Sequence, residues 1–183
     1  MGKKIILILF FNFFIVILLN QTVVAGLKIN EAFPRPSPGV DWVEFYNSSD
    51  EMIDLTNYIL TDVAGNRITF SCWLNPKGFI TVDWGENLNN AGDTIKLKNG
   101  DNIIDCLSYG NGANDFCGDL LPTRLPTPGY NQSLARVRDG DGQWIATAST
   151  TKNGPNDGSL KNPDAICVTP TLTPTPTPTL TPT

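Results

Sequence analysis

Histidine is absent from this chain of 183 residues. Its absence excludes catalysis by a Ser-His-Asp triad, acid–base chemistry on an imidazole and zinc sites that need histidine ligands. Positive charge is also scarce, since 13 Lys and Arg stand against 18 Asp and Glu and leave a formal net charge of −5. An acidic chain lacks the basic surface by which proteins hold nucleic acid, so we expect no nucleic-acid partner.

A sustained helical period is also missing between residue 27 and about residue 167. Short runs of alternating apolar and polar residues recur there instead, separated by Gly, Pro, Asn and Asp. In one run Ile80, Val82 and Trp84 share a face, which is the pattern of a half-buried strand. The pattern predicts one all-β domain, an antiparallel sandwich with strands near residues 27–33, 42–46, 53–55, 58–61, 68–70, 79–84, 94–97, 103–109, 133–137 and 144–146.

The first 25 residues have the features of a secretory signal. Lys3 and Lys4 precede an apolar run from Ile5 to Leu19, and a small residue, Ala25, offers a cleavage site. An uncleaved membrane anchor is the alternative, but a 15-residue helix spans only about 22 Å of an about 30 Å hydrocarbon core. We therefore expect a secreted or cell-surface protein, with membrane contact only through this segment if it is not removed.

The chain ends in a run in which proline and threonine alternate. Such a run favours polyproline II, pairs with no sheet and acts as a spacer. The expected organisation is therefore a signal peptide at residues 1–25, a β-sandwich domain at 26–167 and a Pro/Thr-rich spacer at 168–183. A spacer at the end of the chain also leaves open that a partner domain once followed it.

Four cysteines lie in the part that we expect to be exported. An even number of cysteines in an oxidising compartment predicts two disulfides. Zinc is the alternative, but the chain has no CxxC pair and no histidine. Cys106 is expected to pair with Cys117 and to close an irregular loop between them, which leaves Cys72 for Cys167. No metal and no cofactor are expected.

Several short motifs follow one another in a defined order along the expected domain. The most recognisable stretch is residues 41–47, Asp-Trp-Val-Glu-Phe-Tyr-Asn. The other segments are Ile29-Asn30-Glu31, Asp54-Leu55-Thr56, Leu60-Thr61-Asp62, Ala91 to Leu97, Asp105, Tyr109-Gly110, Ser133 to Arg136, Asp141-Gly142, Trp144 and Gly154-Pro155-Asn156. This ordered set resembles the lamin tail domain family in its secreted prokaryotic form. The resemblance covers nearly all of residues 27–157 and departs from the family at residues 111–127, which look like an insertion, and in the cysteines.

The resemblance implies an immunoglobulin-like sandwich without a catalytic site. We expect Trp42 or Tyr46 to fill the core. Glu44, if it points inward, should accept backbone N–H groups, because an unpaired buried carboxylate is costly. Turn-capping roles are expected for Asn30, Asp62 and Asp93. Structural roles are thus predicted for Asn30, Glu31, Trp42, Glu44, Tyr46, Asn47, Asp54, Asp62 and Asp93.

Three functions from different classes remain open. The first is a non-catalytic module that mediates adhesion, assembly or protein interaction at the cell envelope, with a protein or a glycan as its partner. The second is a carbohydrate-binding module that uses Trp73, Trp84 or Trp144 to stack on sugar rings. The third is a small secreted hydrolase, or an accessory domain of a truncated secreted hydrolase or nuclease.

Overall fold

The computed structural model describes residues 26–111, 117–121, 124–159 and 167–168. It is built from strands and one short 3-10 helix, η1 (Gly118–Leu120). No helix in the described residues is long and apolar enough to cross a membrane. The strands are β1 (Leu27–Phe33), β2 (Asp41–Asn47), β3 (Ile53–Asp54), β4 (Tyr58–Thr61), β5 (Arg67–Thr69), β6 (Trp73–Leu74), β7 (Phe79–Gly85), β8 (Gly92–Asn99), β9 (Asn102–Gly110), β10 (Ser133–Arg138), β11 (Asp141–Thr147) and β12 (Cys167–Val168).

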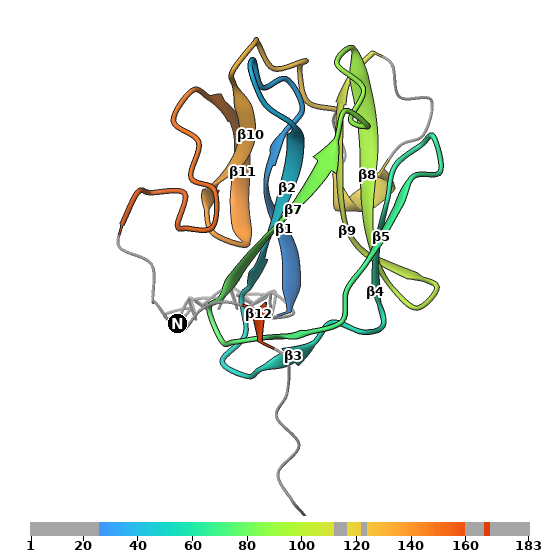
Figure 1. Cartoon of the computed structure of the whole chain (residues 1–183), viewed down its shortest axis with the longest axis vertical. Coiled ribbons are helices and arrows are strands. Elements are labelled where there is room, and N and C mark those ends of the chain that lie inside the picture. Colours follow the sequence, from blue (N-terminus) through green and yellow to red (C-terminus); the bar gives the residue numbers. More distant parts are fainter. Residues whose placement is uncertain (1–25, 112–116, 122–123, 160–166, 169–183) are drawn as a thin grey trace, which may run out of the picture.

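Two antiparallel sheets form the body of the molecule (Figure 1). The five-stranded sheet has the order β11-β10-β1-β2-β7, and the four-stranded sheet has the order β5-β4-β8-β9. A small sheet of β12, β6 and β3 closes one end, at the bottom of Figure 1. The predicted all-β, immunoglobulin-like sandwich is confirmed.

The apolar core lies between the two larger sheets. Val43 and Phe45 of β2 reach it from the five-stranded sheet, and Leu97 and Leu107 reach it from the four-stranded sheet. Phe45 meets Phe70 edge-to-face, with the ring centroids 5.4 Å apart. Trp84 is also buried in this core, in agreement with the alternation in its strand.

The sequence pattern found all the long strands and the two-residue β3, but it missed β6 and β12. β6 and β12 have two residues each, too few to show a period of two. They exist because they pair with each other, Cys167 opposite Leu74, across a long stretch of chain. Only tertiary pairing distinguishes such segments from loop.

Candidate functional site

The outer face of the five-stranded sheet, away from the core, carries most of the family-motif residues. Along β2 the side chains alternate, so Val43 and Phe45 face the core while Trp42, Glu44 and Tyr46 face the other way. The prediction that Trp42 or Tyr46 fills the core is therefore wrong. A period of two shows which residues share a face but not which face is the core.

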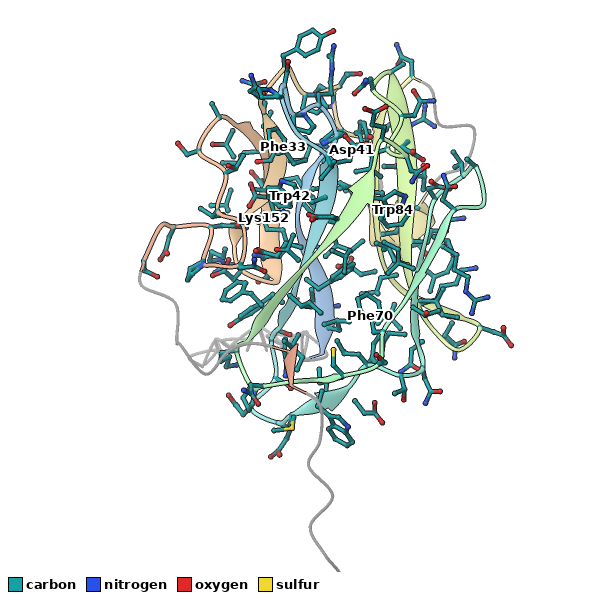
Figure 2. The ribbon with its side chains drawn as sticks, in the orientation of Figure 1. Phe33, Asp41, Trp42, Phe70, Trp84 and Lys152 are labelled. Carbon is teal, nitrogen blue, oxygen red and sulfur yellow. A yellow bond between two sulfur atoms is a disulfide. The ribbon has the colours of Figure 1, made fainter. Side chains whose placement is uncertain are left out.

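A segment that follows β11 covers this outer face. Residues 148–159, here called the C-terminal strap, run back across the sheet from the end of β11 (Figure 1). Trp42 becomes 95% buried although it is not part of the core: its ring meets Phe33 edge-to-face at 5.5 Å, and Lys152 Nζ lies 5.7 Å from its centroid. Figure 2 shows Trp42 and Lys152 side by side.

Asn30 is the centre of a polar cluster beneath the strap. It sits where the β1–β2 register shifts, at a bulge between Ile29 and Glu31. Its Nδ2 donates to Glu44 Oε1 and to Asp139 Oδ1, each at 3.0 Å, and its Oδ1 accepts from Gly140 N at 2.9 Å. One buried amide therefore joins β1, β2 and the turn between β10 and β11.

Glu44 is fully buried in the same cluster and is surrounded by donors. Besides Asn30 Nδ2, Thr81 Oγ1 donates to Glu44 Oε2 at 3.3 Å, and so does Gly154 N of the strap at 3.3 Å. Burial raises the pKa of Glu44 to about 8, the negative charge of Glu31 adds to the rise, and the hydrogen bonds from Asn30 and Gly154 oppose it. Burial outweighs the donors, so Glu44 holds a proton at neutral pH.

Glu31, the neighbour of Asn30, ties the strap to the sheet. The Oε2 atom of Glu31 accepts from Thr151 N at 3.1 Å and from Thr151 Oγ1 at 2.8 Å. Its Oε1 atom accepts from Ser133 Oγ of β10. Glu31 is fully buried, and donors from the strap and from β10 hold both of its carboxylate oxygens.

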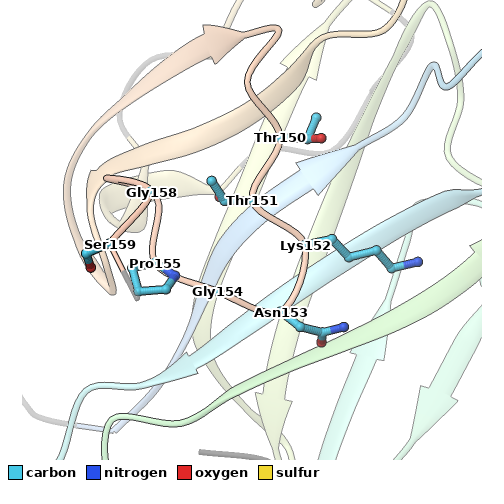
Figure 3. A pocket seen from close by; sticks show the side chains of 8 residues that line it. All are labelled: Thr150, Thr151, Lys152, Asn153, Gly154, Pro155, Gly158 and Ser159. Atoms are coloured by element: carbon cyan, nitrogen blue, oxygen red, sulfur yellow. The ribbon is translucent and has the colours of Figure 1, made fainter. Parts of the chain in front are cut away.

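Asn156 completes the attachment of the strap. Its Nδ2 donates to the carbonyls of Asn30 at 3.2 Å and Arg136 at 2.8 Å, and its backbone N–H donates to Asp139 Oδ1 at 2.9 Å. The strap also forms an open concavity of about 480 Å³, lined by residues 150–155, 158 and 159 (Figure 3).

The polar cluster beneath the strap holds residues 148–159 against the sheet and does not expose a reactive group. The carboxyl groups of Glu31 and Glu44 are buried and bonded to donors from the chain. In the part of the chain that the structure describes, no three His, Cys, Asp or Glu side chains are grouped so that they could hold a metal ion.

A comparison with family models gives a match to the Lamin Tail Domain over residues 20–111. The chain belongs to the lamin tail domain family. No curated protein and no solved structure matches it. A lamin tail domain is a β-sandwich module of immunoglobulin type, and the family is not enzymatic, which is compatible with an interaction role. The match stops at residue 111, although β10 beyond it pairs with β1 inside it.

The other family-motif residues of this lamin tail domain hold turns. Asp93 accepts backbone N–H groups of Asn89 at 3.0 Å and Thr94 at 2.7 Å. Asp62 accepts from Asn66 N at 2.8 Å. Asp54 accepts from Thr56 N at 3.0 Å, and Asn47 Nδ2 donates to the carbonyls of Glu51, Leu74 and Asn75. Asn30 differs from the turn-capping role expected for it, because it lies in a strand and holds a turn 110 residues away.

Sequence reasoning did not assign a role to the pair formed by Asp105 and Arg136. Arg136 Nη2 lies 3.0 Å from both carboxylate oxygens of Asp105, and the two side chains are only 12% and 5% exposed. Both residues belong to motif segments of the family, but only the tertiary structure brings β9 and β10 together. The sequence did offer one signal: Asp105 is a charged residue among the apolar residues of β9, and a charge that is buried in this way needs a partner.

The disulfides agree with the predicted framework as far as the structure describes them. Cys106 and Cys117 are bonded, with their Cα atoms 5.6 Å apart. Cys72 is also disulfide-bonded, and no described cysteine is free. The backbone of Cys167 lies in β12, beside the strand that begins one residue after Cys72. The pairing of Cys72 with Cys167 agrees with this register and stays a prediction.

The buried acid Glu44 predicts an unusual pH dependence of stability. The unfolded chain loses this proton near pH 4.5 and the folded chain near pH 8, so folding binds a proton between these values. The contribution of this proton to the free energy of unfolding is complete below pH 4.5 and is lost as the pH rises through 8. Asp41, whose pKa burial raises to about 6, is already half deprotonated at pH 6 and adds only a small further fall above it. We expect the free energy of unfolding to fall by about 2 kcal/mol from pH 6 to 8.

Urea unfolding of the wild type and of Glu44→Gln at a series of pH values measures this effect. Glu44→Gln keeps the shape of the side chain and removes its titration, so its unfolding free energy should change little over the same range. Glu51→Gln, at an exposed acid, is the matched control and should keep the wild-type slope. Equal slopes in the wild type and in Glu44→Gln would contradict the assignment.

Proposed function

We propose that this chain is a lamin tail module of the secreted prokaryotic type, exported by its N-terminal segment and held at the cell envelope as a non-catalytic binding domain. The observation that carries the proposal is the burial of the acidic side chains of the family motif. Glu31 and Glu44 are buried, and protein donors occupy them. The hydrogen bonds of these two side chains stabilise the fold, so we expect binding to take place at the surface of the domain.

Two sequence features support the location. The apolar N-terminal run with Lys3 and Lys4 has the composition of an export signal, and the disulfides suit an oxidising compartment. The Pro/Thr-rich residues 168–183 have the composition of an extended spacer. Both features favour display at or beyond the envelope.

The aromatic residues that the carbohydrate-binding alternative used do not form a sugar platform. Trp84 is 3% exposed and lies in the core. Trp144 is half-buried, with the Arg136 guanidinium 4.5 Å from its ring centroid. Trp73 is half-buried in β6, part of the small sheet.

Cell fractionation with an antibody against the sandwich tests the proposal. We expect the mature chain, starting after Ala25, in the envelope fraction, and we expect a chain ending at residue 168 to move into the medium. The matched control is a variant of equal length in which every proline of residues 169–183 is replaced by serine. Recovery of the chain in the cytoplasm with residues 1–25 still attached would contradict the proposal.

A further inference from the structure

A polar pocket lies at one end of the sandwich, away from the strap. It has a volume of about 210 Å³ and lies between the β1–β2 loop, the β7–β8 loop and the turn before β10. The side chains that matter to its chemistry are Arg35, Asp41, Glu86, Asn90 and Tyr130. This volume is below the about 300–1,000 Å³ of sites for drug-sized ligands, so the pocket suits a group the size of one sugar ring.

The walls of the pocket combine acceptors and donors of opposite charge. Asp41 is 95% buried, and its Oδ2 atom accepts from Leu88 N at 2.9 Å. Glu86 adds a second carboxylate. Figure 2 shows Asp41 at the end of its strand, near Phe33. A simple anion would meet these two carboxylates at close range and would be repelled.

Arg35 supplies the opposite charge, and not all of the N–H groups of its guanidinium have an acceptor in the protein. Its Nη1 donates to Pro128 O at 3.1 Å, and its Nε is buried without an acceptor in the described structure. A simple cation would be repelled by this guanidinium. A ligand that suits the pocket is therefore neutral overall and offers both donors and acceptors, as the hydroxyl groups of a sugar do.

Tyr130 adds an aromatic surface at the rim. It is 71% exposed, the most exposed of the large apolar side chains in the described structure. The Arg35 guanidinium lies 4.0 Å from its ring centroid and holds one face of the ring. The other face can stack on the C–H groups of a sugar ring, which carry partial positive charge, because an aromatic face is negative.

We propose that this pocket binds a neutral saccharide unit, with Tyr130 stacked on the ring and Asp41, Glu86, Arg35 and Asn90 bonded to its hydroxyls. The proposal deepens the envelope-binding function above and rests on it, because it names a glycan as the partner. Burial, with smaller contributions from Glu86 and Asp93, raises the pKa of Asp41 to about 6. Asp41 can therefore donate as well as accept a hydrogen bond in mildly acidic surroundings.

Saturation-transfer NMR and titration calorimetry on the full chain test the site. The probes are oligomers of N-acetylglucosamine, glucose and xylose, with glycine and glutamate as zwitterionic competitors. We expect one saccharide class to bind with a Kd of about 1 mM, as suits a ligand of this size. No saccharide binding, or binding of the amino acids alone, would overturn the proposal.

Matched variants assign the binding to this pocket. Tyr130→Ala should weaken saccharide binding about tenfold, whereas Tyr130→Phe, which keeps the ring, should change it less than about twofold. Glu86→Ala should weaken binding about fivefold, and Glu51→Ala, at an exposed acid outside the pocket, should not. All three positions are exposed, so the four variants should fold, which thermal unfolding checks. Equal binding by Tyr130→Ala and the wild type would overturn the proposal.

The two proposals fail in different ways. An envelope-bound chain that binds no saccharide refutes the glycan site and leaves the envelope function in place. A chain found in the cytoplasm refutes the envelope function whatever it binds in solution.

Discussion

Replacing Arg136 by methionine is expected to lower the free energy of unfolding by about 3–4 kcal/mol. Arg136 joins the two sheets: it pairs with Asp105 on β9, donates from Nε to Ile29 O on β1 at 2.8 Å and packs over Trp144 on β11. Methionine keeps most of the aliphatic packing and removes the charge. Asp105, 5% exposed, would keep only the backbone donors of Ile29 and Cys106 and would become an uncompensated buried carboxylate.

Arg138→Met, two residues along the same strand, is the matched control. Arg138 pairs with Asp141 at 3.1 Å, but its side chain is 74% exposed, and an exposed pair contributes less than about 1 kcal/mol. Denaturant unfolding of both variants measures the difference. The double variant Asp105→Leu, Arg136→Met should recover part of the loss, because it leaves no buried charge. Equal losses in Arg136→Met and Arg138→Met would show that the buried pair has no special role.

Replacing Asn30 by alanine is expected to cost about 3 kcal/mol and to loosen the C-terminal strap. Glu44 and Asp139 would each lose a donor, and Gly140 N would lose its acceptor, all in or beside a buried cluster. Each of these groups would carry a desolvation cost that no water could fully relieve. Denaturant unfolding measures the loss, and amide exchange of Thr151 and Gly154 reports on the strap.

Asn102→Ala, at an exposed position at the start of β9, is the control and should change stability by less than about 0.5 kcal/mol. Amide exchange of Thr151 should quicken in Asn30→Ala and not in Asn102→Ala. If Asn30→Ala is destabilised but the exchange of Thr151 and Gly154 stays at the wild-type rate, the strap does not depend on Asn30.

Local sequence patterns predicted much of the fold. Alternation located the long strands, and the segment Asp139 to Gly142, which alternates Asp and Gly, lies at the tight connection between β10 and β11. The expected pairing of Cys106 with Cys117 needed only their nearness in sequence, a separation of 11. These features depend on neighbours along the chain, and the sequence displays such neighbours directly.

The candidate site depended on contacts that the sequence does not display. The prediction named Asn30, Glu31 and Glu44 as structural, but it did not foresee that Thr151, Gly154 and Asn156, more than 100 residues later in the chain, would cover them. The placement of Trp42 failed for the same reason. A strand of alternating large apolar and polar residues can bury either face, and the strap buries the second one.

The amino-acid sequence by itself determined the class of this protein: an acidic β-sandwich without histidine, with cysteines spaced for disulfides and ends of unusual composition. The tertiary structure alone decided which face of β2 meets the core, which carboxylates are buried and where a polar pocket opens. The physical reason is the distance along the chain over which each effect acts. Periodicity and turn chemistry act over a few residues, whereas burial and charge pairing depend on segments that meet only after the chain has folded.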